Sequence, residues 1–553
     1  MKLVIVGGVA GGASAAARAR RVDEHAEIVL FERGEDISFA NCGLPYHVGK
    51  TIPNRDALLI MTPARFRART GIDVRVRQEI TAIDPAAHTV TVFDRETERV
   101  YTESYDKLIL SPGASPIRPA IPGVDDPAVT MLWTLADMDR VKARVDDGIR
   151  RVVVAGGGFI GLELVEELRR RNLEVTLVEM APQLLPPFDP EMTTPLAAEL
   201  AANGVRLLLE SPVAALRRAA LGDDTQAETV QVVLGDGRTV SADLVVLAIG
   251  VRPNATLAQS AGLAAGARGG ILVDEKMRTS DPDIYAVGDA VQVTDALGNP
   301  AQIPLAGPAN RQGRIAADNA LGGNATYRGT FGTAVVKLFA LTAASTGASE
   351  KMLKAAAVPY EKIYLNPFSH ATYYPGAQMM HLKLLFSQEG KILGAQIVGR
   401  DGVDKRIDVI ATAMQAGLGV RDLAALELAY APPYGSAKDP VNFAGFVAAN
   451  LLDGKTDVAH ADALPEGAYL LDVREPAEHA AGAIPGSTLI PLGTLRGRLG
   501  ELPRDREIVA YCAVGIRGYL AERILKQEGF KASNLSGGFT TWKLFRAAST
   551  RTA

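Results

Sequence analysis

The stretch Lys2-Leu-Val-Ile-Val-Gly-Gly-Val-Ala-Gly-Gly12 decides the fold of the first part of this chain. Its five leading residues form a nearly continuous apolar run, which predicts a buried parallel strand. An alanine-rich helical segment follows the glycines, and a second apolar run at residues 27–31 ends at Glu32. This order predicts a βαβ unit with an acidic residue about 20 positions after the glycine turn.

The same arrangement recurs between residues 151 and 179. The segment Arg151-Val-Val-Val-Ala155 leads into Gly156-Gly-Gly-Phe-Ile-Gly161, and Glu174-Val-Thr-Leu-Val178 ends at Glu179. Glycine lets the backbone approach a pyrophosphate, and the helix that follows supplies N–H donors. A single glycine motif on its own could also be an ordinary tight turn that binds no nucleotide. The strand, helix and acid of both copies instead predict two dinucleotide sites.

The acid of the second unit bears on the choice of nicotinamide cofactor. The Glu179 carboxylate can accept hydrogen bonds from a ribose 2′-hydroxyl and repels a 2′-phosphate, which favours NADH. The neighbouring residues Arg169, Arg170 and Arg171 leave NADPH open.

The composition excludes several classes of protein. The chain of 553 residues has 59 basic and 63 acidic side chains, so no global field favours nucleic acid or an anionic membrane. It holds no apolar run of roughly 18 residues, and its first apolar run is too short for a secretory signal. Two cysteines cannot form a disulfide framework, and no metal-binding motif is present. We therefore expect a cytoplasmic protein without a metal site.

The two cysteines lie in similar settings. Cys42 stands in Ser38-Phe-Ala-Asn-Cys-Gly-Leu-Pro-Tyr46, and Cys512 in Tyr511-Cys-Ala-Val-Gly-Ile-Arg-Gly518. Each follows a strand-like segment, in a loop of small residues that suits an exposed thiol better than core packing. The placement predicts sulfur redox chemistry.

The glycine turns and the segment Thr279-Ser-Asp-Pro-Asp-Ile-Tyr-Ala-Val-Gly-Asp289 resemble the FAD-dependent pyridine nucleotide-disulfide oxidoreductases over residues 1 to 445. The resemblance implies that Glu32 contacts the adenosine ribose of FAD and Asp289 its ribityl chain. It also implies a homodimer. The residues expected to contact FAD or the nicotinamide cofactor are Gly7, Gly8, Val9, Ala10, Gly12, Glu32, Arg33, Ala114, Asp289, Gly156, Gly158, Phe159, Ile160, Gly161 and Glu179.

The expected fold class is α/β, with two Rossmann-like FAD and NAD(P) domains, an α+β dimerisation domain and a C-terminal rhodanese-like α/β domain. The expected boundaries are 1–110 and 271–325 for FAD, 111–150 as a connection, 151–270 for NAD, 326–450 for dimerisation, 451–463 as a polar linker and 464–553 for the last domain.

Cys42 has no second cysteine near it. Most disulfide reductases of this superfamily carry Cys-x-x-x-x-Cys here, whereas this chain has His47 at the second position. The partner sulfur must therefore come from another molecule. The stretch around Cys42 resembles the single-cysteine branch that contains coenzyme A-disulfide reductases, NADH oxidases and NADH peroxidases.

The first helical segment carries Ser14, Arg18 and Arg21 on one face, where two guanidiniums could hold phosphates. A solvated charged face is the alternative on spacing alone. The resemblance implies instead a set of coenzyme A contacts, namely Ser14, Arg18, Arg21, Ser38, Asn41, Asn310 and Lys438.

Two aromatic segments, His370-Ala-Thr-Tyr-Tyr374 and Tyr430-Ala-Pro-Pro-Tyr434, resemble a pair of active-site tyrosines that the family donates across its dimer. Tyr430 fits one position. The other is Tyr373 or Tyr374, and we favour Tyr373. A phenol there could give a proton to a leaving thiolate, and aromatic packing is the alternative.

The loop of Cys512 predicts an anion nest, because its successive N–H groups point inward and Arg517 adds a positive charge. Residues 464–548 resemble a single-domain rhodanese, with Asp472-Val-Arg-Glu-Pro-Ala-Glu-His479 and Leu535-Ser-Gly-Gly-Phe-Thr-Thr-Trp542 as further matches. An inactive rhodanese-like binding module is the alternative.

The domain order resembles the coenzyme A-disulfide reductase–rhodanese fusions, which include NADH-dependent persulfide and polysulfide reductases. This resemblance implies electron flow from NADH through FAD to Cys42, with coenzyme A and small persulfides or polysulfides as substrates and Cys512 as the sulfane carrier. Two alternatives remain open: an NADH oxidase or peroxidase that cycles Cys42 through sulfenic acid, and a sulfurtransferase or sulfur carrier.

Overall fold

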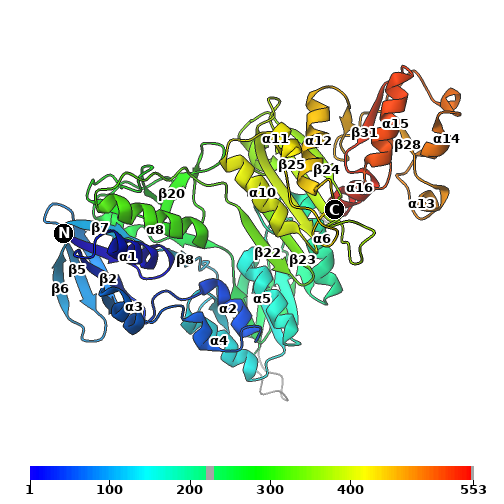
Figure 1. The fold of residues 1–553 in the computed structure, drawn as a ribbon. Coiled ribbons are helices and arrows are strands. Elements are labelled where there is room, and N and C mark those ends of the chain that lie inside the picture. Colours follow the sequence, from blue (N-terminus) through cyan, green and yellow to red (C-terminus); the bar gives the residue numbers. More distant parts are fainter. Residues whose placement is uncertain (219–228, 550–553) are drawn as a thin grey trace, which may run out of the picture. The chain divides into compact units, whose positions relative to one another are not determined.

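The computed structural model describes residues 1–218 and 229–549. The chain forms two compact units (Figure 1). We call Met1–Met180 with Gly204–Gly332 the N-terminal unit, and Ala181–Asn203 with Thr333–Ala553 the C-terminal unit.

The N-terminal unit holds two parallel sheets of five strands. The first has the order β19-β7-β1-β2-β3, with β1 (Lys2–Val6), β2 (Glu27–Glu32), β3 (Asp73–Val76), β7 (Lys107–Leu110) and β19 (Ile284–Ala286). The second has the order β12-β11-β10-β16-β9, with β9 (Val129–Met131), β10 (Arg151–Ala155), β11 (Glu174–Val178), β12 (Arg206–Leu208) and β16 (Leu244–Leu247). Strands buried on both faces need the continuous apolar runs that the sequence shows.

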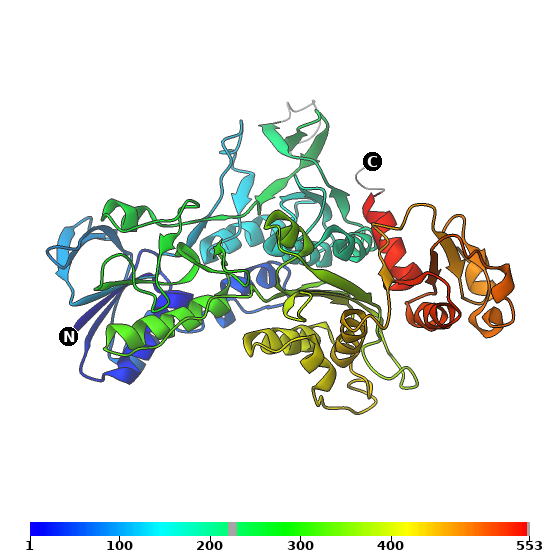
Figure 2. The ribbon, with the colours of Figure 1, turned by 90° about the horizontal axis from the view of Figure 1, so that it is seen from above.

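Helices follow the two glycine turns as predicted. Helix α1 (Ala10–Val22) follows β1, and α5 (Phe159–Arg170) follows β10. Helix α8 (Ala306–Ala320) packs along α1, and Figures 1 and 2 show the two side by side from two directions. The other helices of this unit are α2 (Leu44–Val48), α3 (Pro63–Thr70), α4 (Leu135–Asp146), α7 (Thr256–Ser260) and the 3-10 turns η1 (Asn41–Gly43), η2 (Arg55–Leu58) and η3 (Gly288–Ala290).

Smaller sheets complete the unit. One is an antiparallel sheet of β4 (Gln78–Asp84), β5 (Thr89–Asp94) and β6 (Val100–Ser104), which lies in sequence between β3 and β7 of the parallel sheet. The remaining strands are β13 (Val213–Arg218), β14 (Val230–Leu234), β15 (Thr239–Ala242), β8 (Ala114–Pro116), β17 (Val251–Pro253), β18 (Ile271–Leu272), β20 (Val291–Thr294) and β21 (Pro300–Ala301).

The first sheet of the C-terminal unit is antiparallel and has the strand order β22-β23-β26-β25-β24. Its strands are β22 (Ala334–Leu338), β23 (Leu341–Gly347), β24 (Glu361–Leu365), β25 (Met380–Phe386) and β26 (Ile392–Gly399). The helices that accompany it are α6 (Pro190–Ala202), α9 (Glu350–Ala355), α10 (Val403–Gln415), α11 (Val420–Ala425) and α12 (Pro440–Leu452). Strand β24 lies at the edge of this sheet.

A third parallel sheet closes the chain, in the order β27-β31-β30-β28-β29. Its elements are β27 (Val458–Ala459), β28 (Tyr469–Asp472), β29 (Thr488–Leu489), β30 (Ile508–Tyr511), β31 (Ala532–Leu535), α13 (Pro476–Ala480), α14 (Leu492–Leu495), η4 (Leu499–Glu501), α15 (Ile516–Gln527) and α16 (Gly538–Ser549). Within the described residues, no helix combines the length and apolar character needed to cross a membrane.

Candidate active site

The first glycine turn forms a tight connection between β1 and α1. Gly7 has φ +95°, and a Cβ there would lie 2.1 Å from the Ser111 carbonyl oxygen, so only glycine fits. Val9 keeps a negative φ and therefore needs no glycine. No side chain caps α1, whose first N–H groups are then available to an anion. Gly8 and Ala10 line the same turn, and Gly12 packs against the Gly7 carbonyl.

Glu32 lies beside this turn at the end of β2. Its carboxylate accepts hydrogen bonds from the N–H groups of Gly8 (2.8 Å) and Gly34 (2.7 Å). This position, next to a turn that can hold a pyrophosphate, suits contact with an adenosine ribose. Arg33 is exposed directly after it, and Ala114 is buried at the start of β8.

The second glycine turn repeats the geometry. Gly156 has φ +113°, and a Cβ there would lie 2.3 Å from the Ala248 carbonyl oxygen, whereas a Cβ on Gly158 would meet nothing within 4 Å. The open side at Gly158 leaves room for a diphosphate. Glu179 accepts a hydrogen bond from the Gly157 N–H (2.6 Å). The other predicted contacts, Phe159, Ile160 and Gly161, form the first residues of α5.

Asp289 lies in η3, at the end of the segment that follows β19. Burial raises the pKa of its carboxyl group to about 6. A carboxylate enclosed in this way is a suitable acceptor for hydroxyl groups of a bound cofactor. The turns, the acids and Asp289 therefore fit FAD at the first sheet and a nicotinamide dinucleotide at the second.

Cys42 is exposed in η1, directly before α2. Protein still surrounds most of the thiol, and this partial burial is the main cause that raises its pKa. The negative charges of the Glu163 and Asp289 carboxylates raise it further. Burial and the two carboxylates therefore all disfavour the Cys42 thiolate. The Cys42 turn packs tightly, since a Cβ on Gly43 would lie 2.4 Å from the Leu58 side chain. Ser38 adopts φ +50°, and Asn41 begins η1.

His47, at the position of the missing second cysteine, has a structural contact. Its imidazole is buried, and Nδ1 lies 2.7 Å from the Ile52 carbonyl oxygen. This hydrogen bond closes the loop after α2.

Glu163 was missed by the sequence reasoning. It lies on α5, where the Tyr46 hydroxyl of α2 donates a hydrogen bond to its carboxylate (3.1 Å). Burial raises the pKa of Glu163 to about 7, and the neighbouring Glu166 and Glu167 add to the shift. The sequence held one signal for it: Glu163 stands four residues after Phe159, a predicted cofactor contact, and therefore on the same face of the helix.

The predicted coenzyme A contacts divide between the two units. On α1, the Arg18 guanidinium pairs with both Asp318 oxygens of α8 (2.5 and 3.1 Å), and Ser14 hydrogen-bonds to Asn310. Arg21 is exposed at the end of α1. Arg18 is thus engaged by Asp318, a partner about 300 residues away that the spacing pattern gave no means to find. Lys438 is exposed in the C-terminal unit.

The two tyrosine segments meet. The Tyr373 and Tyr430 hydroxyl oxygens lie 2.6 Å apart, and this hydrogen bond raises the pKa of Tyr373. Both side chains are exposed (74% and 46%). Tyr374 instead packs edge-on against His370, with ring centroids 5.6 Å apart.

A buried arginine holds these two segments together. Arg406 of α10 donates to the Ser369 carbonyl (2.8 Å) and forms an ion pair with the buried Asp439 (3.0 Å). The Ala371 N–H donates to the Gly435 carbonyl (2.9 Å), which joins the segments directly. Arg406 is a second residue that sequence reasoning missed.

Cys512 is buried, so the expectation of an exposed thiol was wrong for this residue. The loop curls over the sulfur, and the Gly515 N–H donates to Sγ (3.2 Å). Arg517, on the first turn of α15, forms two hydrogen bonds of 2.7 Å with Glu478. These bonds, together with the neighbouring Cys512, raise the pKa of Arg517.

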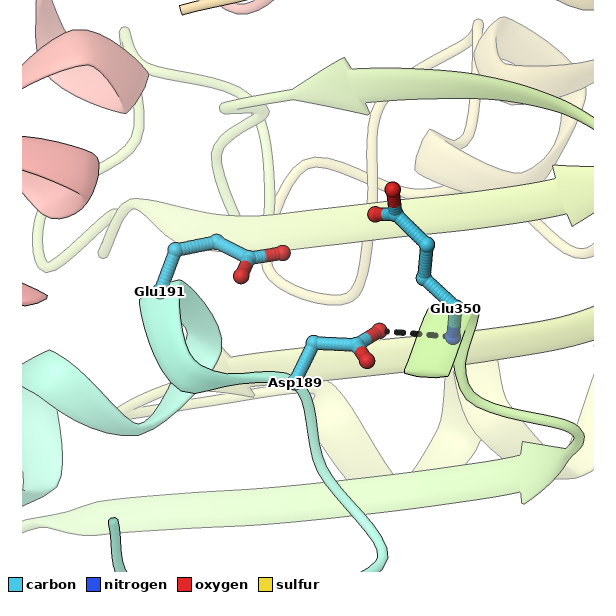
Figure 3. A group of neighbouring side chains, drawn as sticks. All are labelled: Asp189, Glu191 and Glu350. Carbon is cyan, nitrogen blue, oxygen red and sulfur yellow. Dashed lines mark hydrogen bonds between the residues drawn. The ribbon is translucent and has the colours of Figure 1, made fainter. Parts of the chain in front are cut away.

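Three carboxylates of the C-terminal unit converge as in a metal site (Figure 3). They belong to Asp189, Glu191 and Glu350, and all are buried. The fully buried Lys383 ammonium lies 2.9, 2.6 and 2.6 Å from them. Burial lowers the pKa of Lys383, but the three carboxylates outweigh it and raise the pKa. The ammonium thus occupies the position that a metal ion would take.

Comparison with known families gives three matches along the chain. Residues 1–313 match the pyridine nucleotide-disulphide oxidoreductase model, 333–440 its dimerisation domain, and 456–544 the rhodanese-like domain. These matches confirm the predicted fold class and the predicted resemblance.

Individual relatives agree with these family matches. A coenzyme A disulfide reductase of Staphylococcus aureus is 36% identical over 81% of this chain and 99% of its own length. The reduced Bacillus anthracis CoADR-RHD is 49% identical, with a TM-score of 0.95, and the alignment covers 100% of this chain and 98% of that one. A NAD-dependent persulfide reductase from A. fulgidus is 39% identical, with a TM-score of 0.91 and coverage of 98% and 100%.

Proposed function

The chain belongs to the pyridine nucleotide-disulphide oxidoreductase family, and we propose that it is an NADH-dependent reductase of persulfides, with coenzyme A persulfide or disulfide as substrate. The observation that carries this proposal is the presence of two different thiols in one chain. One is exposed beside the Glu163 and Asp289 carboxylates, and the other lies in an amide-lined rhodanese-like loop.

The proposed net reaction consumes one persulfide and one NADH. A persulfide R–S–SH, NADH and a proton give R–SH, hydrogen sulfide and NAD⁺, and coenzyme A disulfide gives two thiols by the same balance. FAD, when bound, would take a hydride from NADH and deliver the electron pair to sulfur. We assign FAD to residues 1–110 and 271–325 and the nicotinamide cofactor to 151–270. The acid Glu179 beside the second turn favours NADH.

Cys42 would accept the sulfane sulfur. Its thiolate would attack the outer sulfur of the persulfide, so that the S–S bond breaks, the thiolate R–S⁻ leaves and Cys42 carries the persulfide. The electron pair from NADH, with a proton, would then break the new S–S bond, release hydrogen sulfide and restore the Cys42 thiolate. The absence of a second cysteine at His47 supports an external sulfur partner.

The tyrosine pair would supply a proton. The Tyr373–Tyr430 hydrogen bond fixes one phenol as donor to the other, and a phenol near the leaving thiolate could protonate it. The match of residues 333–440 to the dimerisation domain supports a homodimer. Both phenols are exposed in the single chain, which fits the proposal that they act in the partner's site.

Coenzyme A would bind through the α1 face and the Cys42 turn. Ser14, Arg18 and Asn310 already form a polar row where α1 and α8 pack together. A phosphate there would compete with Asp318 for the Arg18 guanidinium, which keeps the site paired when it is empty. Arg21, Ser38, Asn41 and Lys438 stay predicted contacts.

Cys512 would carry sulfane sulfur from a donor. The Gly515 N–H already points at Sγ, and the same donor would stabilise a persulfide anion. Fusion to the reductase raises the local concentration of carried sulfur without any further binding step.

The test is a panel of oxidants in steady-state NADH oxidation, run with the wild type, Cys42→Ser and Cys512→Ser. We expect rapid turnover with coenzyme A persulfide, loss of at least about a hundredfold in Cys42→Ser, and a selective loss with sulfane donors in Cys512→Ser. Turnover that depends on oxygen or peroxide, or full activity of Cys42→Ser, would contradict the proposal.

A further inference from the structure

The Cys512 loop is held from outside by the start of α16. The Phe539 N–H donates to the Cys512 carbonyl (2.8 Å), and the Thr540 N–H donates to the Ala513 carbonyl (2.9 Å). In a trans peptide the N–H points opposite to the C=O. Fixing these two carbonyls against α16 therefore turns the N–H groups of Ala513 and Val514 away from α16.

The contact between α16 and the loop is close. A Cβ on Gly538 would lie 2.4 Å from the Cys512 carbonyl oxygen and 2.8 Å from the Gly515 nitrogen. Gly515 is the residue whose N–H donates to the Cys512 sulfur. A small displacement of Gly538 would therefore be transmitted to a group that contacts the sulfur.

The turn at Gly537, directly before α16, is anchored by Asn366, which lies outside the rhodanese-like match of residues 456–544. Asn366 directly follows the edge strand β24, and its side-chain NH₂ donates to the Gly537 carbonyl (2.9 Å) and to Thr541 Oγ1 (3.1 Å). Its Oδ1 lies 2.6 Å from His381 Nδ1 of β25. The acceptor at Gly537 fixes the orientation of the amide, so His381 donates to it.

The surroundings of Asn366 make this anchor rigid. Asn366, Ser536 and Thr541 are all buried (6%, 4% and 1% exposed). The Tyr364 N–H adds a parallel bond to Ser536 Oγ (2.9 Å). Buried hydrogen bonds are costly to leave unmade, so the turn can move only if the whole group breaks.

We propose that Asn366 is a positioning residue for Cys512, so that a residue of the dimerisation domain completes the sulfur-carrying site. This inference rests on the proposed function, in which Cys512 carries sulfane sulfur. Asn366 acts through the Gly537 turn and the start of α16, and it does not itself touch the reacting sulfur.

The chain offers a clean readout, because it has only two cysteines. In a Cys42→Ser background, Cys512 is the sole thiol, and its alkylation by iodoacetamide reports its reactivity directly. The test variant is Asn366→Leu, which removes the amide and keeps a similar volume. The matched control is Asn442→Leu. Asn442, in α12, is also buried and donates to two backbone carbonyls, those of Leu423 (3.0 Å) and Leu426 (2.8 Å).

We expect Asn366→Leu to change the alkylation rate of Cys512 at neutral pH, and to lower sulfur transfer from thiosulfate to cyanide, by about tenfold or more. NADH oxidation with coenzyme A disulfide, measured with Cys42 intact, should stay within about twofold of wild type. Asn442→Leu should leave Cys512 reactivity unchanged. Thr541→Ala removes one of the two acceptors and should give an intermediate effect, which covers the case in which Asn366→Leu does not fold.

Two results would overturn the inference. One is wild-type reactivity of Cys512 in both Asn366→Leu and Thr541→Ala. The other is an equal loss of both activities in Asn366→Leu and Asn442→Leu, which would indicate general destabilisation. Failure of the proposed function is separate, because it would appear as full activity of Cys42→Ser, or as an undiminished rate with sulfane donors in Cys512→Ser, whatever Asn366 does.

Discussion

Glu163 and Tyr46 form a hydrogen-bonded polar pair near Cys42. The Glu163 carboxylate is the largest charged influence on the Cys42 thiol, after burial itself, and it opposes ionisation of that thiol. Its own pKa, raised by burial to about 7, lets it gain or lose a proton near neutral pH. Cys42 reactivity should therefore depend on the protonation state of a neighbour that titrates in the working range.

This dependence predicts the effect of Glu163→Gln. Removal of the carboxylate removes a like charge from beside the developing thiolate, so the pKa of Cys42 should fall. In the holoenzyme with Cys512→Ser, alkylation of Cys42 at neutral pH should become roughly three- to tenfold faster. Glu167→Gln, one turn further along α5 and bonded to Thr51, should instead slow the alkylation slightly, because loss of this charge lowers the pKa of Glu163 and leaves Glu163 more ionised. An unchanged rate in Glu163→Gln would show that the carboxylate does not act on Cys42.

Helix α10 positions two segments that the sequence separates by about 60 residues. Arg406 reaches from this helix to the Ser369 carbonyl and to Asp439, at the start of α12. The two segments between these anchors carry Tyr373 and Tyr430, whose hydroxyls lie within hydrogen-bond distance. The spacing of the phenols thus follows from a buried ion pair rather than from packing of the exposed rings.

Replacing Arg406 by Met should uncouple the segments. The Asp439 carboxylate would stay buried without its partner, which should lower the free energy of unfolding by about 3–5 kcal/mol. Coenzyme A disulfide reduction should fall by roughly tenfold, while flavin reduction by NADH should keep its rate. Adding Asp439→Asn to Arg406→Met removes the unpaired charge and keeps an oxygen for the Val441 N–H, so part of the stability should return. Slower flavin reduction in Arg406→Met would contradict this assignment.

The C-terminal unit joins its antiparallel and parallel sheets through buried polar groups. Lys362 bridges Glu350 and Asp462, and Tyr364 bonds to Glu191. His460 packs against Tyr364, His381 bonds to Asn366, and burial lowers the pKa of each imidazole to about 4. Both histidines are therefore neutral in the folded protein, next to the lysines Lys543 and Lys362 that oppose their protonation.

This arrangement predicts acid sensitivity of the C-terminal unit. Between pH 6.5, the ordinary pKa of histidine, and about pH 4, the pKa of both residues in the folded protein, the unfolded chain binds protons that the folded chain does not. Stability should therefore fall as the pH drops through that window, by up to about 1.4 kcal/mol per pH unit for each histidine. Urea unfolding measured at several pH values should show this slope, and His460→Gln should reduce it. A free energy of unfolding that stays constant across the window would refute the assignment.

The parts predicted from the sequence are those with local signals. The glycine turns, the acids Glu32 and Glu179 and the Cys512 loop each depend on residues close in the chain, where spacing alone carries the geometry. The burial of Cys512 was not predicted, because its side chain packs in a core cluster with residues distant in the chain, such as Leu471 and Ile490. Arg18–Asp318, Arg406–Asp439 and Asn366–Gly537 join distant segments, and the sequence pattern holds no information on such pairs. The assigned roles of the site residues stay predictions.

Electron transfer from NADH to sulfur through Cys42 can be tested in an anaerobic reaction with coenzyme A persulfide, in which NADH oxidised and sulfide released are measured together. We expect one sulfide for each NADH in the wild type, and neither NADH oxidation nor sulfide release in Cys42→Ser. Sulfide release at the wild-type rate from Cys42→Ser, or NADH oxidation without sulfide in the wild type, would contradict it.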